Sequence, residues 1–349
     1  MDNTKSLLEL EPDDDGRIRR TGNALTASIH IVTVVVGAGV LALAWAMAQL
    51  GWILGIASII TFASVSIFTY NLVADCYRYP DPVTGRRNYT YMQAVKAYLG
   101  GTMHVFCGLV QYTKLAGITV GYTITSSTSL VAIRKAICIH KGGHEASCKF
   151  SNNIFMIGFG ILQIFLSQIP NFHELTWLST VAAITSFGYV FVGSGLCLSV
   201  VLSGKGASTS ITGIKLPAED KLLRVFTGMG NIALACTYAT VIYDIMDTLK
   251  SSPPENKQMK RANVLGVTAM TILFLLCSGL GYAAFGDNTP GNILTGFTEP
   301  FWLVALGNGF IIFHMIGAYQ VRSLIFPINQ FHMIGAYQFR SFIFSINQE

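Results

Sequence analysis

Residues 23–50 read NALTASIHIVTVVVGAGVLALAWAMAQL, a stretch without Lys, Arg, Asp or Glu. A helix of about 20 mostly apolar residues crosses the roughly 30 Å of hydrocarbon in a bilayer. Because water is absent there, the backbone groups of such a segment must pair with one another. Eight stretches meet this description and predict an all-α polytopic membrane protein; they are residues 23–50, 52–74, 103–133, 152–170, 175–203, 225–243, 262–286 and 300–321.

The composition of the chain agrees with a membrane protein and excludes several other classes. Of the 349 residues, 52% are hydrophobic and 12% are charged, whereas an ordinary soluble domain carries about 25% charged residues. The seven Cys and the net charge of +5 are both small for this length. These numbers exclude a disordered chain, a coiled coil and a disulfide-dense secreted module. They also predict the lipid bilayer, and no nucleic acid, as a partner.

The Lys and Arg residues of the loops indicate how the chain is oriented, since they favour the cytoplasmic side of a membrane. If residues 1–22 are cytoplasmic, the loops on that side carry twelve Lys and Arg and the opposite loops carry eight. The outer loop at 134–151 contains Cys138 and Cys148, with His140 and His144 between them. A disulfide, a zinc site and free thiols are all open at this point, because the redox environment decides between them.

Two of the predicted spans contain glycines that weaken a helix. The first span contains Val36-Gly37-Ala38-Gly39-Val40, and the sixth contains Gly228-Met229-Gly230-Asn231 ahead of residues 232–238. A helix interrupted at mid-membrane exposes N–H groups that can hold a carboxylate and carbonyls that can hold a cation. The alternative is close packing of neighbouring helices through small residues.

The ionisable side chains inside the predicted spans include His30, Lys114 and His314. A charge at membrane depth is functional by default, and a histidine can titrate near neutral pH, so these are candidates for carrying a coupling proton. Each histidine can instead be a neutral group that is hydrogen-bonded to a neighbouring helix. We find no paired carboxylates, metal cluster or activated nucleophile at membrane depth, so the sequence does not favour an enzyme or a metal site.

Several motifs follow one another along residues 17–321. They are the segment 30–52, DCYR at 75–78, PDPVTG at 80–85, NYTY at 88–91, GYTIT at 121–125, QIPNF at 168–172, DTLK at 247–250 and HMIGAYQV at 314–321. Together they resemble plant amino acid permeases of the amino acid/auxin permease family. The resemblance implies a proton-coupled importer of amino acids in the plasma membrane, with a cytoplasmic N-terminus. The importer that the resemblance implies works by symport and alternating access, with the proton as coupling ion and no cofactor.

The same resemblance implies a bundle of the leucine-transporter type, built from two inverted five-helix repeats. On that architecture the substrate carboxylate meets the backbone of Gly37, Ala38, Gly39 and Val40. The substrate amino group meets carbonyls of the two interrupted helices, among which we expect those of Val36 and Ala235. Thr33 takes the place of a polar side chain at a cation site, and Tyr238 bounds the pocket for the substrate side chain.

The chain also departs from the family pattern. After a tail at 1–22, it supplies a first repeat at 23–203, an outer loop at 204–221 and three helices of a second repeat at 222–322, where the family usually has eleven helices in all. Residues 313–330 are then repeated at 331–348 with fifteen of eighteen positions identical, which makes 323–349 a duplicated segment. The alternative function is therefore a truncated, non-transporting paralogue that acts as an interaction or regulatory membrane subunit. The oligomeric state is unknown.

Overall fold

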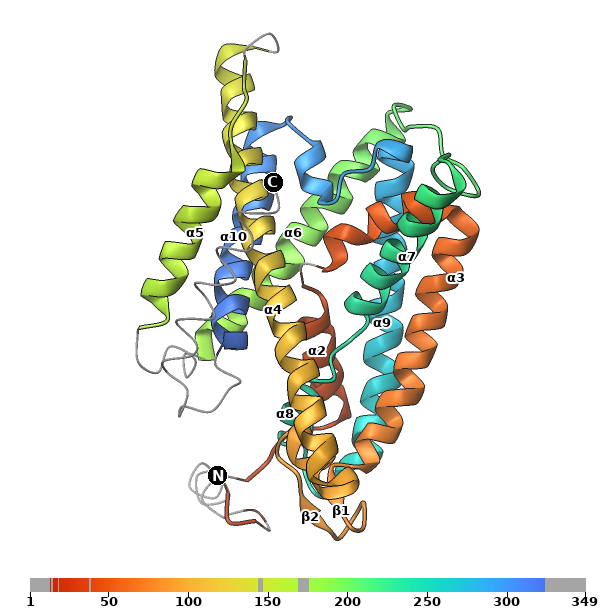
Figure 1. The fold of residues 1–349 in the computed structure, drawn as a ribbon, viewed down its shortest axis with the longest axis vertical. Helices are drawn as coiled ribbons and strands as arrows, with labels where there is room; N and C mark the ends of the chain where they lie inside the picture. Colours follow the sequence, from red (N-terminus) through yellow and green to blue (C-terminus); the bar gives the residue numbers. More distant parts are fainter. Residues whose placement is uncertain are drawn as a thin grey trace, which may run out of the picture. The chain divides into compact units, whose positions relative to one another are not determined.

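The computed structural model describes residues 13, 15–17, 19–37, 39–143, 147–168 and 176–323, with the backbone alone for 176–180 and 321–323. The described residues form helices and one short hairpin (Figure 1). The chain divides into two compact units, which alternate along the sequence. The duplicated segment predicted at 323–349 lies outside the described residues from position 324 onward.

The first unit comprises Met1–Val35, Ile60–Leu109 and Cys236–Ile272. It contains two complete helices, a hairpin, and the parts of three long helices that fall within those ranges. The complete helices are α2 (Ala24–Val35) and α8 (Ile242–Met246), and the long helices are α3 (Gly39–Asp75), α4 (Tyr91–Gly142) and α9 (Glu255–Phe285). In the hairpin, β1 (Arg78–Tyr79) pairs antiparallel with β2 (Arg86–Arg87), and Arg78 lies opposite Arg87.

The second unit comprises Val36–Ile59, Val110–Ala235 and Leu273–Glu349. It contains the beginning of α3 and the later parts of α4 and α9. Its own elements are α5 (Asn152–Leu166), α6 (Thr176–Leu202), α7 (Ala218–Ala235), the 3₁₀ turns η2 (Gly286–Asn288) and η3 (Ile293–Gly296), and α10 (Phe301–Ser323). Helix α10 packs on α6 and also contacts α5 (Figure 1).

Local sequence sets where several helices begin. The Asn23 side chain accepts hydrogen bonds from the N–H groups of Leu25 and Thr26, at 2.9 and 3.0 Å, and so caps α2. Ser151 does the same for α5, through the N–H of Asn153. Helices α7 and α9 carry acidic residues in their first turns, where the helix dipole favours negative charge. The elements therefore begin at the positions that capping chemistry favours.

Five helices of the described part of the chain are long and apolar enough to cross a membrane, which confirms the all-α polytopic class. The other three of the eight predicted stretches have a different form. The first is divided between α2 and the beginning of α3, the fourth is the 15-residue α5, and the sixth is divided between α7 and α8. Apolar length alone therefore located the helical segments but did not show which of them are continuous.

Gly51 joins the two stretches that the sequence separates at residues 50–52. Its φ of 78° lies in the left-handed region, and a Cβ there would collide with the backbone of Gly213 and Ile211. Only glycine meets both conditions. The Lys221 ammonium donates hydrogen bonds to three carbonyl oxygens around this bend, those of Gln49, Thr212 and Ile214, at 2.6, 2.9 and 3.0 Å. The bend is therefore held by backbone contact and by a charged cap.

Candidate functional site

The first predicted interruption is present in the structure. Helix α2 ends at Val35, residues Val36 and Gly37 form a bend, and α3 begins at Gly39. Ala38 lies outside the described residues. Among the contacts between described residues, the N–H of Val40 donates to the Gly37 carbonyl at 3.1 Å, and the N–H groups of Gly37 and Gly39 have no acceptor. The start of α3 therefore offers donors at the positive end of a helix dipole.

The second interruption is also present. Helix α7 ends at Ala235, residues 236–241 are not helical, and α8 begins at Ile242. The last carbonyls of α7 have no partner within their own helix, and they lie at the negative end of its dipole. The predicted glycines Gly228 and Gly230 fall inside α7 rather than at its end. The break thus comes several residues later than the glycines suggest.

Within the second unit, the start of α3 and the end of α7 are in direct contact. A Cβ placed on Gly39 would lie 3.2 Å from the Ala235 Cβ and 3.4 Å from its Cα. Further along the pair, a Cβ on Gly228 would lie 3.4 Å from the Ala46 carbonyl oxygen. The two segments run antiparallel through small residues, so the N–H end of one half-helix meets the carbonyl end of another. Such an arrangement can bind a group that carries both a negative and a positive charge.

The remaining predicted substrate residues are largely buried. Val36 and Val40 are at most 3% exposed, so they contribute backbone rather than side chain to any site. Thr33 is half-buried, and its hydroxyl donates to the Ile29 carbonyl of its own helix at 2.9 Å. Tyr238 is buried, and its hydroxyl donates to Asn263 Oδ1 at 2.7 Å. A contact between Tyr238 and a substrate side chain stays a prediction.

The three ionisable candidates have different surroundings. His314 on α10 is buried; its Nδ1 lies 2.7 Å from the Ser186 Oγ and 3.1 Å from the Ala182 carbonyl oxygen. His30 on α2 is exposed, and Lys114 on α4 is half-buried. The histidines belong to different units. Of the three, His314 is the one whose side chain is buried.

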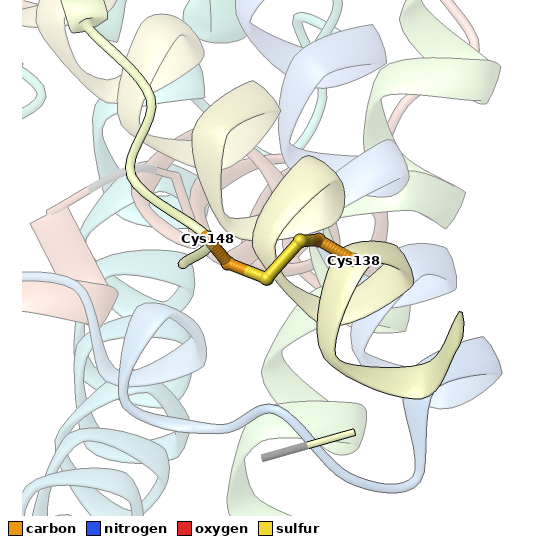
Figure 2. The surroundings of a disulfide bond; sticks show 2 residues. All are labelled: Cys138 and Cys148. Carbon is orange, nitrogen blue, oxygen red and sulfur yellow. A yellow bond between two sulfur atoms is a disulfide. The ribbon is translucent and has the colours of Figure 1, made fainter. Parts of the chain in front are cut away.

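Cys138 and Cys148 form a disulfide, with their Cα atoms 5.9 Å apart (Figure 2). The bond ties the last turn of α4 to the segment that precedes α5, so it closes the loop that the sequence assigns to the outer side. Of the two histidines between the cysteines, His140 stacks on Phe301, with the two ring centroids 3.9 Å apart. The other, His144, lies outside the described residues. The loop cysteines are thus used in a covalent crosslink.

The first unit also contains a charge cluster that the sequence analysis treated as separate loop charges. The Arg20 side chain, 4% exposed, forms ion pairs with Asp13, Asp15 and Asp247. Its hydrogen bonds to Asp15 hold the pKa of this carboxyl well below its usual range. Arg78 and Arg87 both pair with the buried Glu255, at 2.7 and 2.8 Å. The acidic run Asp13-Asp14-Asp15, followed closely by Arg17, Arg19 and Arg20, is the sequence signal that could have indicated this charge cluster.

Comparison with known proteins identifies the family. The transmembrane amino acid transporter protein family matches residues 20–335. Amino acid permease 1 of Arabidopsis thaliana is 54% identical over 88% of this chain and 65% of its own length. Amino acid permease 8 of the same plant is 51% identical over 89% of this chain and 67% of its own length. Lysine histidine transporter-like 1, also from Arabidopsis thaliana, is 28% identical over 85% of this chain and 64% of its own length.

These matches confirm the resemblance to plant amino acid permeases that the motifs indicate. The names of the three relatives describe transport rather than catalysis. The chain spans about two thirds of the length of each of them. Since the family match covers most of the sequence, the chain belongs to the transmembrane amino acid transporter protein family.

Proposed function

We propose that this chain imports amino acids together with protons across the plasma membrane, with its N-terminus in the cytoplasm. The observation that carries the proposal is the contact between Gly39, at the start of α3, and Ala235, at the end of α7. The start of α3 offers N–H groups there, and the end of α7 offers carbonyls. An amino acid is a zwitterion, so it suits a site of that kind. The names of the relatives, amino acid permease 1 and amino acid permease 8, support the same substrate class.

The substrate carboxylate accepts hydrogen bonds from the backbone N–H groups of residues 37–40, at the start of α3. Two of these, on Gly37 and Gly39, have no acceptor among the described residues. The substrate ammonium donates to carbonyls at Val36 and at the end of α7, where Ala235 is the last residue. Binding in both places uses backbone dipoles, which recognise the part that all amino acids share and leave the side chain unspecified.

The coupling proton binds to His314 in this proposal. The His314 Nδ1 lies 3.1 Å from the Ala182 carbonyl oxygen, which can only accept a hydrogen bond, and 2.7 Å from the Ser186 Oγ, which can donate or accept. When the serine hydroxyl donates to the Ala182 carbonyl, as its 2.8 Å contact allows, Nδ1 carries the ring hydrogen and Nε2 is the nitrogen that takes up the proton. The protonmotive force would favour inward movement of this charge, since one charge crossing 100 mV of membrane potential is worth about 2.3 kcal/mol.

The proposal is tested by expressing the chain in oocytes and measuring substrate-induced current while the external pH is varied. We expect inward current on addition of neutral and acidic amino acids, larger at acidic external pH. Amino acid amides, which lack the carboxylate, should give none. Surface labelling measures how much protein reaches the plasma membrane. Absence of current despite normal surface labelling would overturn the proposal and leave the non-transporting membrane subunit as the function.

A further inference from the structure

The non-helical residues after α7 are held by one face of α3 within the first unit. Ser66 donates its Oγ hydrogen to the Cys236 carbonyl oxygen at 3.2 Å. One helical turn later, the Tyr70 hydroxyl lies 2.9 Å from the Thr237 Oγ1, and it accepts a hydrogen bond from the Tyr238 N–H at 3.0 Å. Residues four apart share one face of a helix. This face of α3 therefore supplies partners for three consecutive residues of the interruption.

Tyr70 is the central member of this set. Its side chain is buried, and its ring centroid lies 4.0 Å from that of Tyr238. A phenol has one hydrogen to donate. Since the Tyr238 N–H already donates to the Tyr70 oxygen, the one hydrogen of that phenol can go to Thr237 Oγ1. In that arrangement, the half-buried Thr237 keeps its own hydroxyl hydrogen for a further acceptor.

Tyr238 is also fixed at the far end of its side chain. Its hydroxyl donates to Asn263 Oδ1 at 2.7 Å, and the Asn263 amide donates to Asn71 Oδ1 at 3.1 Å. Asn71 follows Tyr70 on α3, so the same helix holds both the backbone and, through one intermediate, the side-chain tip of Tyr238. Backbone N–H and C=O groups outside a helix are tolerated at membrane depth only where other groups form hydrogen bonds with them. These contacts give the interruption a defined conformation.

We propose that Tyr70 is a positioning residue for amino acid binding, which fixes residues 236–238 through its hydroxyl group. The inference rests on the proposed function, because it assigns the purpose of the fixed conformation to substrate recognition at the interrupted sixth span. The Tyr70 ring and the Tyr70 hydroxyl have separate roles. The ring fills space against Tyr238, whereas the hydroxyl determines how the backbone of 236–238 runs.

The first test is the variant Tyr70→Phe, which keeps the ring and removes the hydroxyl. The matched control is Tyr98→Phe, since the Tyr98 hydroxyl lies in the same unit but donates to the Arg78 carbonyl of the hairpin, at 2.6 Å, rather than to the interruption. Loss of two ordinary hydrogen bonds corresponds to about thirtyfold in an equilibrium constant. We expect Tyr70→Phe to raise the substrate KM by up to about thirtyfold with normal surface labelling, and Tyr98→Phe to leave the KM within about twofold.

A role in stability alone would instead lower the surface amount and the maximal current in proportion, with the KM unchanged. That pattern in Tyr70→Phe would overturn the inference. If the parent chain gives no current, the proposed function fails, and a second measurement still decides the role of Tyr70. Hydrogen exchange of the purified full chain should accelerate in the peptide covering 236–241 for Tyr70→Phe and not for Tyr98→Phe. Equal exchange in the two variants would show that Tyr70 does not hold this segment.

Discussion

Replacement of Gly39 by alanine tests the contact on which the proposed function depends. The added Cβ would lie 3.2 Å from the Ala235 Cβ and 3.4 Å from the Ala235 Cα. Optimal separations between carbon atoms are about 3.5–4.0 Å. The start of α3 and the end of α7 must therefore move apart by a few tenths of an ångström. Because both partners are short side chains on helical backbone, neither can relieve the contact by rotating.

Overpacking of this kind typically costs about 1–3 kcal/mol, and the small displacement places Gly39→Ala at the lower end of that range. A change of about 1 kcal/mol corresponds to roughly fivefold in apparent affinity. We therefore expect the substrate KM to rise about fivefold in Gly39→Ala, as measured from substrate-induced currents. Gly39→Leu adds a much larger side chain at the same position, so it should abolish substrate binding while the protein still reaches the membrane.

The matched control is Gly230→Ala on α7. A Cβ at Gly230 meets nothing within 4 Å, so this variant makes the same chemical change on the partner helix without the clash. Alanine is favoured over glycine in a helix by about 1 kcal/mol, so the control should fold at least as well as the parent. The reasoning is refuted if Gly39→Ala and Gly230→Ala have the same KM as the parent chain. It is also refuted if both variants raise the KM equally.

Three further predictions test other parts of the structure. His314→Gln should flatten the dependence of uptake on external pH, while His30→Gln should retain it; the opposite result would assign the proton to His30. Glu255→Gln removes the carboxylate that two buried guanidinium groups share, although Arg87 keeps its pair with Asp15 at 3.3 Å, so it should destabilise the protein by about 3 kcal/mol, seen as a lower thermal midpoint than exposed Glu299→Gln gives. The folded-state pKa of Asp15 is depressed by Arg20, so its contribution to stability is present above its ordinary pKa of about 3.9 and is lost as the pH falls below that value. Asp15→Asn should therefore lower the thermal midpoint at neutral pH and reduce its fall on acidification, and an unchanged acid response would contradict this assignment.

The helical segments were predictable because their apolar length is a property of the sequence alone. The position of the first interruption was predictable too, since Gly37 and Gly39 weaken the helix where α2 ends and α3 begins. The residues at which helices begin and end were harder to predict from the sequence. Helix α4 begins at Tyr91, ahead of the predicted span at 103–133, because a shorter helical segment precedes the span across a break at Gly100, whose φ of 83° lies in the left-handed region. The bend at Gly51 depends on its contact with Gly213, far away in the sequence.

Contacts between distant residues were the part that sequence reasoning could not reach. The pair of Arg20 with Asp247 joins residues that are 227 positions apart, and each alone resembles an ordinary charge beside a membrane. The pairing of Arg78 with Glu255 spans 177 positions in the same way. The cysteine loop was intermediate, because its spacing permitted a disulfide but did not choose between that bond and two alternatives.

The two interruptions differ in how their backbone is satisfied, and this difference bears on where a substrate binds. At the second, side chains of α3 already accept from the Tyr238 N–H and donate to the Cys236 carbonyl. At the first, the N–H groups of Gly37 and Gly39 have no acceptor among the described residues. Unpaired donors at membrane depth are unfavourable, so a carboxylate gains most where they remain. On the proposed function, the first interruption therefore supplies the N–H groups that bind the substrate carboxylate, and the second is the interruption whose backbone is fixed in advance by α3.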